Sequence, residues 1–307
     1  MIPGLSIVIP TYKRPQGLAV LLDSIVSDVE GRSDIAVIVA DNDRERSAEA
    51  IVERIAATAA LHFEYTVAPE PGVSNARNAA MDLVRSPCVL FLDDDMEVMP
   101  GFVDAMLATS QALGASLTFA PIRAVLPQDA NRLADWLAPL FSRQIDGESR
   151  LIEQVQGTGG CLFDMRGLTL PYPVFDPALN ETGGEDDALF AAILRQGGRA
   201  AWCAEAQAME HVPTHRTTLK YLWTRHFAYG QTPSRLAAGK GLFGAPAVMK
   251  WMAVGSVQSF VHGVAWLCLR LAGRPSHVGQ LGRLAQGIGK VFWWDGLSPR
   301  FYGRSAR

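Results

Sequence analysis

The stretch CVLFLDDDMEV, residues 88–98, joins an apolar run to three consecutive carboxylates, Asp93, Asp94 and Asp95. Such a run is typical of a buried strand, whereas adjacent carboxylates repel one another. Because side chains alternate along an extended chain, we expect Asp93 and Asp95 on one face and Asp94 on the other. Two carboxylates on one face suit Mg²⁺ or Mn²⁺, which complete their shell with water and phosphate oxygens. The alternative is a solvated acidic turn.

Strand-like runs alternate with helical patterns over the first 125 residues, which predicts βαβ units and a mostly parallel sheet. Ligands bind such sheets beyond the carboxyl ends of the strands. The polar segments TYKRP, DNDRE and DDDME all follow strand-like runs, so we expect them to meet in one crevice. The predicted fold is therefore α/β, with a Rossmann-like central sheet flanked by helices. The strand-like runs are LSIVI (5–9), IAVIVA (35–40), HFEYTV (62–67) and CVLFL (88–92).

Two further residues indicate a nucleotide diphosphate ligand. Asp41 ends the run VIVADND, where it either accepts a hydrogen bond from a base or ribose or caps a turn. Arg77, in PGVSNARNAAMD, either meets a phosphate or pairs with an acid such as Asp82. An acceptor, a cation and metal-binding carboxylates beyond one sheet edge together predict a nucleotide diphosphate site.

A second acidic cluster lies in GGEDDALF, residues 183–190. Carboxylates on a metal are poor bases, so a reaction that deprotonates a nucleophile requires a separate carboxylate off the metal. Asp186 is the candidate base. The alternative is that Glu185, Asp186 and Asp187 only interact favourably with a helix N-terminus. The preceding Gly183 and Gly184 indicate either a close approach of the backbone to a ligand or a tight turn.

The net charge of −3 hides a division of the chain. Residues 216–307 hold 13 Lys or Arg and one acid, whereas the first 215 residues hold 15 basic and 30 acidic residues. Five of the seven tryptophans and the uncharged run 251–269 also lie in the basic part. This combination predicts a helical appendage on an anionic membrane surface. Polar residues within the run favour the membrane interface over a spanning helix, and a soluble packing or dimerisation appendage is the third interpretation.

Cysteine spacing and the N-terminus predict the compartment. Four scattered cysteines without a CxxC spacing indicate a reducing compartment and argue against a structural zinc site. The N-terminus lacks the basic and long apolar regions of a secretory signal. We therefore expect a cytoplasmic protein at the inner face of the cell membrane, with no nucleic-acid partner.

Five motifs occur in the order and at about the spacing of the inverting family 2 glycosyltransferases, which have the GT-A fold. They are IPTYKRP, VIVADND, PGVSNARNAAMD, VLFLDDDMEV and GGEDDALF. The chain resembles that family over residues 5–236, and the succinoglycan-biosynthesis type of bacterial exopolysaccharide glucosyltransferase in particular. The resemblance implies a GT-A domain at 1–236, with a nucleotide-sugar-binding half at 1–125 and an acceptor and catalytic-base half at 126–236. The remaining residues, 237–307, form the membrane-associating appendage.

The resemblance also implies roles for the matching residues on the donor side. Thr11 and Asp41 would bind the base of a nucleotide sugar, usually uridine, and Arg77 would hold the nucleotide. Asp93 and Asp94 would contact the ribose or the shell of the metal.

On the metal and acceptor side, the resemblance implies that Asp95 ligates Mn²⁺ or Mg²⁺. Asp186 would take the proton of the acceptor hydroxyl as that oxygen attacks the anomeric carbon, with inversion. His211 either joins the metal, as a histidine does in some GT-A enzymes, or is structural. The loop on the acceptor side comprises Gly183, Gly184 and Glu185.

The expected function is transfer of a hexose, with glucose as the first choice, from a UDP-sugar to an oligosaccharide on a polyprenyl diphosphate lipid, in exopolysaccharide or other cell-surface polysaccharide biosynthesis. One rival is a membrane-associated scaffold that binds nucleotide sugar without turnover. Another is an aspartyl-phosphate-type phosphatase, although Glu97 stands where that class usually has Thr or Val. A sugar nucleotidyltransferase is a third, but SIVIPTYKRP lacks its glycine-rich loop.

Overall fold

A computed structural model describes residues 4–180, 183–239 and 241–299. The described residues form two compact units, one from residues 4–125, 141–180 and 183–211 and the other from residues 126–140, 212–239 and 241–299. The expected boundary at residue 236 falls inside α7 (Leu219–Ala238), a helix that packs against α8 (Ala245–Leu271) and α9 (His277–Val291). Contacts therefore group α7 with the C-terminal helices and not with the sheet.

The first unit is built on an eight-stranded sheet in the order β3-β2-β1-β4-β9-β6-β10-β8. The four strands β3, β2, β1 and β4 are parallel, as the alternating pattern predicted, and β9 lies antiparallel between β4 and β6. The prediction of an α/β fold with a parallel-rich sheet is confirmed. The strands are β1 (Leu5–Thr11), β2 (Ile35–Asp41), β3 (His62–Val67), β4 (Cys88–Phe91), β6 (Leu117–Phe119), β8 (Arg150–Ile152), β9 (Cys161–Asp164) and β10 (Ala200–Trp202).

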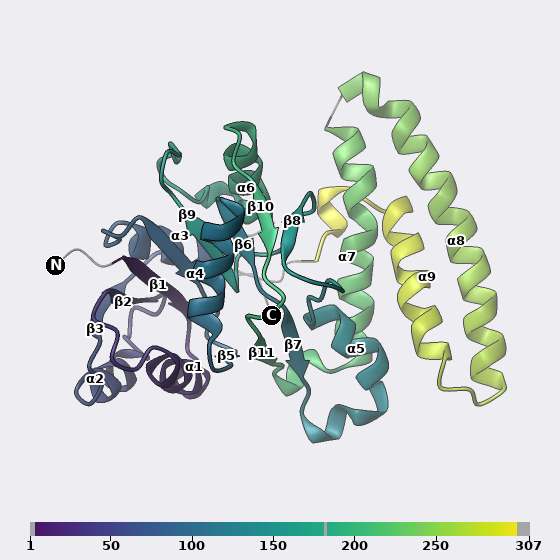
Figure 1. The fold of residues 1–307 in the computed structure, drawn as a ribbon. Helices are drawn as coiled ribbons and strands as arrows, with labels where there is room; N and C mark the ends of the chain where they lie inside the picture. Colours follow the sequence, from purple (N-terminus) through teal and green to yellow (C-terminus); the bar gives the residue numbers. More distant parts are fainter. Residues whose placement is uncertain (1–3, 181–182, 240, 300–307) are drawn as a thin grey trace. The chain divides into compact units, whose positions relative to one another are not determined.

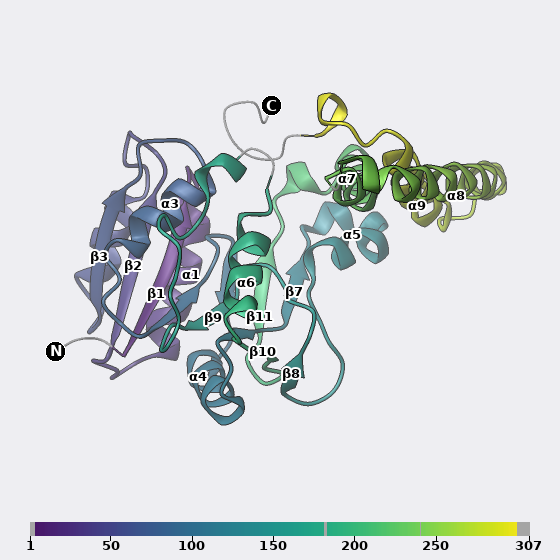
Figure 2. The same ribbon diagram turned by 90° about the horizontal axis from the view of Figure 1, so that it is seen from above.

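Alternating side chains of these strands supply two separate cores, one on each face of the sheet. Ile7 and its alternate neighbours pack with α1 (Pro15–Asp28), α2 (Glu49–Ala56) and α4 (Phe102–Leu113). Val8 and its alternate neighbours pack with α3 (Val73–Met81) and α6 (Glu185–Arg195). Figure 2 shows β3, β2 and β1 side by side with α3 across them. Each fully buried aliphatic or aromatic side chain contributes about 1.5–3 kcal/mol, so both faces stabilise the sheet.

Strand register brings distant segments of the chain to one end of the sheet. Phe91, the last residue of β4, pairs with Cys161, the first residue of β9. The Gly160 amide donates to the Phe91 carbonyl at 2.8 Å. Because the two strands are antiparallel, the aspartates that follow β4 meet the glycine-rich segment 157–160 that precedes β9.

A second, three-stranded sheet lies beside the end of the aspartate run. It has the order β5-β11-β7, with Glu210 of β11 paired to Met96 of β5. The amide of His211 donates to the carbonyl of Asp95 at 2.7 Å. The backbone of His211 is thus tied to the candidate metal ligand. The strands are β5 (Met96–Val98), β7 (Ile122–Val125) and β11 (Ala208–His211).

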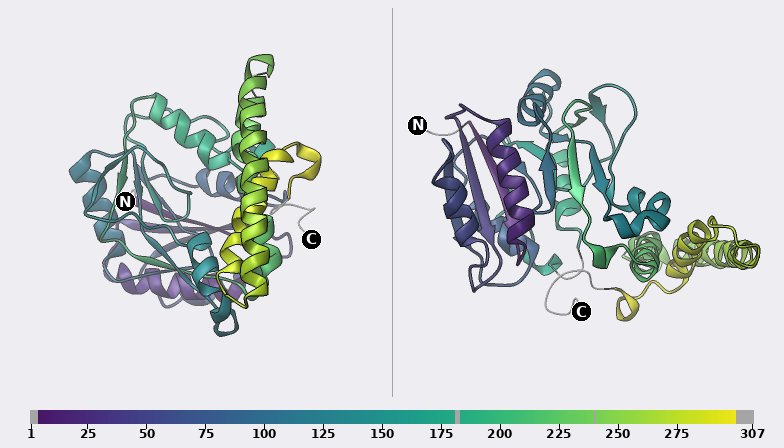
Figure 3. Two further views of the ribbon diagram at one scale, coloured as in Figure 1. Left: turned by 90° about the vertical axis from the view of Figure 1, so that its right-hand side faces the viewer. Right: turned by 90° about the horizontal axis from the view of Figure 1, so that it is seen from below.

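The second unit is a helical layer in which glycines let backbones touch. A Cβ at Gly289 of α9 would lie 2.1 Å from the carbonyl oxygen of Phe227 in α7, and one at Gly255 of α8 would lie 2.6 Å from that of Gly287 in α9. The three helices run side by side, as Figure 1 and the right view of Figure 3 show. The unit also contains α5 (Ala134–Phe141), and short 3-10 helices occur at Gln128–Leu133, Pro177–Leu179, Thr214–Arg216, Gly241–Gly244 and Asp295–Leu297.

The polar residues inside the apolar run of α8 are used within the helical layer. Gln258 donates to the carbonyl of Arg283 at 2.8 Å and accepts from Lys290 at 2.9 Å, and His262 bonds Gln280 at 2.7 Å. All three contacts lie between α8 and α9. Between residues 251 and 269 the exposed large side chains of α8 are instead apolar. The segment Gly241–Leu271 is long and apolar enough to cross a membrane by length and composition. The predicted C-terminal apolar helix is confirmed.

Candidate active site

Asp94 is the most firmly held residue of the aspartate run. Its carboxylate accepts from the Thr11 hydroxyl at 2.8 Å, from the Tyr12 amide at 3.4 Å and from the Arg14 guanidinium at 3.0 Å. Burial raises the pKa of Asp94 to about 6, while Arg14 opposes the rise. These donors all come from the end of β1 and the turn after it, so Asp94 locks that turn to the end of β4.

The expectation that Asp93 and Asp95 share a face is wrong. The strand ends at Phe91, and Asp94 and Asp95 form a turn in which both accept from the same nitrogen of Arg14, at 3.0 and 2.7 Å. Asp93 is directed elsewhere, because its Oδ1 lies 3.7 Å from Nη2 of Arg77. Alternation applies only while the chain stays extended, and the turn ends it two residues after β4.

Arg77 connects the two acidic clusters. Its Nη1 donates to Oε1 of Glu185 at 2.7 Å, while its Nη2 faces Asp93. The guanidinium also stacks on the Phe175 ring, 5.3 Å from its centroid. The expected pairing with Asp82 is therefore wrong, and Glu185 takes that place. Burial raises the pKa of Glu185, and Arg77 counteracts the rise.

Arg77 is buried with one donor unused. Its side chain is 8% exposed, and its Nε has no hydrogen-bond partner among the described residues. A buried N–H without a partner is uncommon and needs an explanation. It fits a residue that gains an acceptor when an anionic ligand arrives.

The glycine-rich segment 157–160 lies next to both Asp93 of the first acidic cluster and Asp186 of the second. A Cβ at Gly159 would lie 2.1 Å from Oδ2 of Asp93, and one at Gly157 would lie 3.7 Å from Oδ2 of Asp186. Arg143 lies against both glycines, and its Nη1 donates to the carbonyl of Gly157 at 2.9 Å. Asp93, Arg143 and Asp186 therefore surround one short stretch of side-chain-free backbone.

Asp186 lies in the first turn of α6, directly after two glycines with left-handed backbone. Gly183 and Gly184 have φ values of 75° and 93°, and within the described part of the chain no atom beyond their chain neighbours lies within 4 Å of a Cβ placed on either. Both adopt the left-handed backbone that a tight turn requires, and their approach to a ligand stays a prediction. Glu181 and Thr182, just before it, lie outside the described residues.

Asp41 is buried beneath the predicted base site with its carboxylate engaged. Its oxygens accept from the amides of Asp43 and Ala48 and from the Tyr65 hydroxyl, at 2.9, 2.8 and 2.8 Å. Burial, together with this hydrogen bond, raises the pKa of Tyr65. These bonds match the turn-capping interpretation of Asp41, and its contact with a base stays a prediction.

The residues near Asp95 offer only part of a metal shell. Among the described residues no group of three or more His, Cys, Asp or Glu is arranged to hold a metal. The imidazole of His211 bonds Glu97 at 2.7 Å, an arrangement that also orients metal-bound histidines. A cation, Arg14, already contacts Asp95. This donor set fits an ion that takes one or two protein carboxylates and completes its shell from a diphosphate and water.

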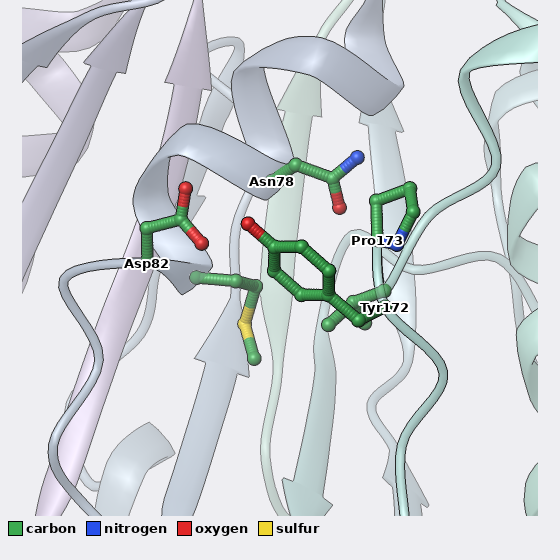
Figure 4. A pocket seen from close by; sticks show the side chains of 6 residues that line it. Asn78, Asp82, Tyr172 and Pro173 are labelled. Atoms are coloured by element: carbon green, nitrogen blue, oxygen red, sulfur yellow. The ribbon is translucent and has the colours of Figure 1, made fainter.

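A pocket of about 300 Å³ lies apart from these residues (Figure 4). It is lined by Asn78 of α3, by Asp82 directly after that helix, and by Tyr172 and Pro173, with the Tyr172 ring beneath the helix. No predicted site residue lines it. We therefore do not assign it to the site.

Arg14, Arg143 and Glu97 were missed in the sequence. Arg14 stands in the quoted motif TYKRP, where a basic residue at a strand end next to Pro15 was an available signal. Arg143 and Glu97 had no local signal, because each reaches the site through long-range pairing.

The fold and these residues define a GT-A-like α/β protein. Two structures of S. aureus TarS 1-349 have a similar fold. One has a TM-score of 0.53 and 14% identity, and the match covers 97% of this chain and 99% of that chain. The other, in complex with UDP, has a TM-score of 0.54 and 13% identity, and the match covers 93% of this chain and 90% of that chain. GalNAc-T7 with UDP, GalNAc and Mn²⁺ has a TM-score of 0.54 and 16% identity, over 76% of this chain and 51% of that one.

Residues 6–167 match the family model described as Glycosyl transferase family 2. The succinoglycan biosynthesis protein ExoM of Rhizobium meliloti (strain 1021) is 31% identical over 284 residues, which cover 91% of this chain and 89% of that protein. The chain belongs to glycosyl transferase family 2. The resemblance predicted from the five motifs is confirmed, and the family decides for a glycosyltransferase over a phosphatase.

Proposed function

We propose that this protein is a metal-dependent inverting glycosyltransferase that moves a hexose, with glucose as the first choice, from a UDP-sugar to a lipid-linked oligosaccharide. The observation that carries the proposal is the buried Arg77, which faces Asp93 of the first acidic cluster and bonds Glu185 beside Asp186 of the second. One cation thus links the carboxylates assigned to the donor with the carboxylate assigned to proton transfer.

The donor side of the proposal rests on the turn after β1 and on Arg77. Thr11, Asp41 and Asp94 shape the pocket for the base and ribose, and the unused Nε–H of Arg77 is available to a phosphate oxygen. Asp95, with His211 as a second ligand, would hold Mn²⁺ or Mg²⁺ against the diphosphate. A bound ion would stabilise the negative charge of the departing diphosphate. UDP in a TarS structure and UDP with Mn²⁺ in GalNAc-T7 support this choice of ligands.

The acceptor side rests on Asp186. The acceptor oxygen forms a bond to the anomeric carbon, the bond from that carbon to the diphosphate oxygen breaks, and UDP leaves with the electron pair. The acceptor proton passes to the carboxylate of Asp186. One displacement inverts the anomeric centre, so an α-linked donor gives a β-glycoside. Arg143, beside Gly157, places a positive charge near Asp186.

The helical unit supports a membrane-bound acceptor. The large exposed side chains of α8 include Val257, Phe260 and Leu271 at 65%, 73% and 80% exposure. Basic residues flank this apolar surface, which suits anionic lipid headgroups. We propose that the unit lies on the inner face of the cell membrane, where a polyprenyl diphosphate acceptor is presented. The relationship to ExoM supports a role in exopolysaccharide biosynthesis.

The experiment is a panel of UDP-sugars with Mn²⁺ or Mg²⁺ and membrane-extracted lipid-linked acceptors. Loss of general base catalysis lowers a rate by about 10²–10⁴-fold, so we expect Asp186→Asn to lose transfer by that factor while UDP binding persists. The matched control is Asp187→Asn, an exposed neighbour in the same helix turn. Full transfer by Asp186→Asn would disprove the base. UDP binding without hydrolysis or transfer of any sugar would favour the scaffold.

A further inference from the structure

We propose that Arg14 is an internal countercation of the Asp94–Asp95 turn, and that the divalent ion arriving with the nucleotide diphosphate displaces it from Asp95. This inference rests on the function proposed above. It assigns to Arg14 a positioning role that makes metal and nucleotide bind together.

The geometry of Arg14 is that of a cation shared by two carboxylates. A single nitrogen, Nη1, lies 3.0 Å from Oδ1 of Asp94 and 2.7 Å from Oδ2 of Asp95. The three side chains are 32%, 8% and 13% exposed, so solvent screens the two contacts little. Without this charge, the buried carboxylate of Asp94 and the half-buried carboxylate of Asp95 would repel each other. Arg14 therefore stabilises the turn when no ligand is present.

The turn that carries Arg14 is built to keep it there. Lys13 has a φ of 54°, a left-handed conformation that is uncommon for a residue with a side chain, and Pro15 follows as the first residue of α1. A Cβ on Gly17 would lie 2.6 Å from the carbonyl oxygen of Asp94. The first turn of α1 thus rests on the backbone of the same aspartates that Arg14 contacts through their side chains.

The two aspartates differ in what else holds them. Asp94 also accepts from the Thr11 hydroxyl and the Tyr12 amide, so it stays in place if Arg14 moves. Asp95 is the residue to which we assign the metal. A divalent ion on that carboxylate competes with Arg14 for the same oxygen lone pairs and repels the guanidinium. Arg14 can give up Asp95 and keep its bond to Asp94.

This competition couples the metal to the nucleotide. A free ion must displace Arg14 and place extra positive charge beside it, which makes binding weak. The diphosphate brings negative charge that accommodates both the ion and the released guanidinium. Each ligand therefore raises the affinity of the other, by the same factor. Arg14 determines how strongly each ligand raises the affinity of the other, because it weakens binding of the ion only when the diphosphate is absent.

The test is Mn²⁺ binding to the full chain, followed by the electron paramagnetic resonance signal of free Mn²⁺, with and without saturating UDP. The quantity of interest is the ratio of the two Kd values. Arg14 competes with the ion through a charge-assisted hydrogen bond to Asp95, and removal of such a bond corresponds to about tenfold or more in affinity for the ion. We expect Arg14→Gln and Arg14→Ala to bind Mn²⁺ alone about tenfold tighter than the wild type, and the ratio to fall by the same factor.

The matched control is Lys13→Asn. It also removes one positive charge, at the residue next to Arg14, but the Lys13 ammonium lies 3.8 Å from Asp43. It should leave the ratio within about threefold of the wild type. The inference would be overturned if the ratio of Kd values were unchanged in both folded Arg14 variants. It would also be overturned if both variants bound Mn²⁺ more weakly by the same factor with and without UDP. Absence of any joint Mn²⁺ and UDP binding in the wild type would instead refute the proposed function.

Discussion

Replacing Arg77 by methionine tests whether the bridge between the two acidic clusters holds the fold together as well as the donor. The substitution removes the charge but keeps a long side chain against Phe175. Arg77 and Glu185 are 8% and 9% exposed, so Glu185 is left as a buried carboxylate without its partner. Removing one member of a buried pair costs about 3–5 kcal/mol. We expect the lower end of that range, because Glu185 can take up a proton.

A loss of about 3 kcal/mol corresponds to a fall of roughly 6–12 °C in Tm for a domain of this size class. Urea unfolding at pH 7.5 measures the free energy directly. The pKa of Glu185 is already raised by burial, and loss of Arg77 raises it further. A carboxyl with a raised folded-state pKa is penalised increasingly as the pH rises from about 4.5 through that pKa. Lowering the pH from 7.5 to 5.5 should therefore recover part of the loss.

The double variant Arg77→Met/Glu185→Leu separates stability from binding. Replacing both members of a buried pair by apolar residues is often neutral, so we expect stability within about 1 kcal/mol of the wild type. UDP affinity, measured by calorimetry, should stay at least about tenfold weaker, because the donor to the phosphate is gone. Arg85→Met, an exposed arginine that bonds only nearby carbonyls among its described contacts, is the control. A double variant as unstable as the single one would refute the ion-pair argument.

Three further predictions concern other parts of the chain. Gly17→Ala places a methyl group 2.6 Å from the carbonyl oxygen of Asp94, and we expect a loss of about 1–3 kcal/mol in urea unfolding; a stability equal to the wild type would contradict that contact. Burial lowers the pKa of His226, so the unfolded chain binds the proton more readily and Tm should fall as the pH drops below about 6.5. A His226→Gln variant should lack that part of the fall in Tm. Parallel curves of Tm against pH for the two proteins would exclude the effect. Phe260→Glu should reduce sedimentation of the full chain with anionic vesicles by about tenfold or more, whereas Leu151→Glu, at an exposed apolar residue of the sheet, should not; equal loss in both would argue against α8 as the membrane contact.

Most of the fold was predictable because its signals are local. The β-branched runs ending at Thr11, Asp41 and Phe91 and the helices between them follow from hydrophobic pattern alone. The pattern predicted parallel strands joined by right-handed connections, but not their order β3-β2-β1-β4. The insertion of β9 was not predictable, since a run of four residues gives no indication of its partner.

The candidate site was predictable in its residues but not in its contacts. The motifs identified the acidic residues and Arg77, and polar strand ends explain why they gather. The partner of Arg77 was not predictable, because Glu185 lies 108 residues away and Asp82 is the nearer acid in the sequence. The bridge from Arg14 depends on a left-handed Lys13 and on a turn that starts after Phe91, neither of which a period-two pattern can indicate.

The sequence separation between Arg77 and Glu185 has a consequence for folding during synthesis on the ribosome. The helices α1, α2 and α4 can cover their face of the sheet from residues made early, and Arg14 can neutralise Asp94 and Asp95 as soon as β4 has emerged. Packing of the opposite face is completed later, because Arg77 of α3 is buried against Glu185, which is synthesised 108 residues later. The two faces of one sheet therefore complete their packing at different times, and a chain released before α6 leaves Arg77 with Asp93, at 3.7 Å, in place of the closer Glu185. We expect a chain truncated before α6 to be less stable, and more readily cleaved by proteases, than the full chain.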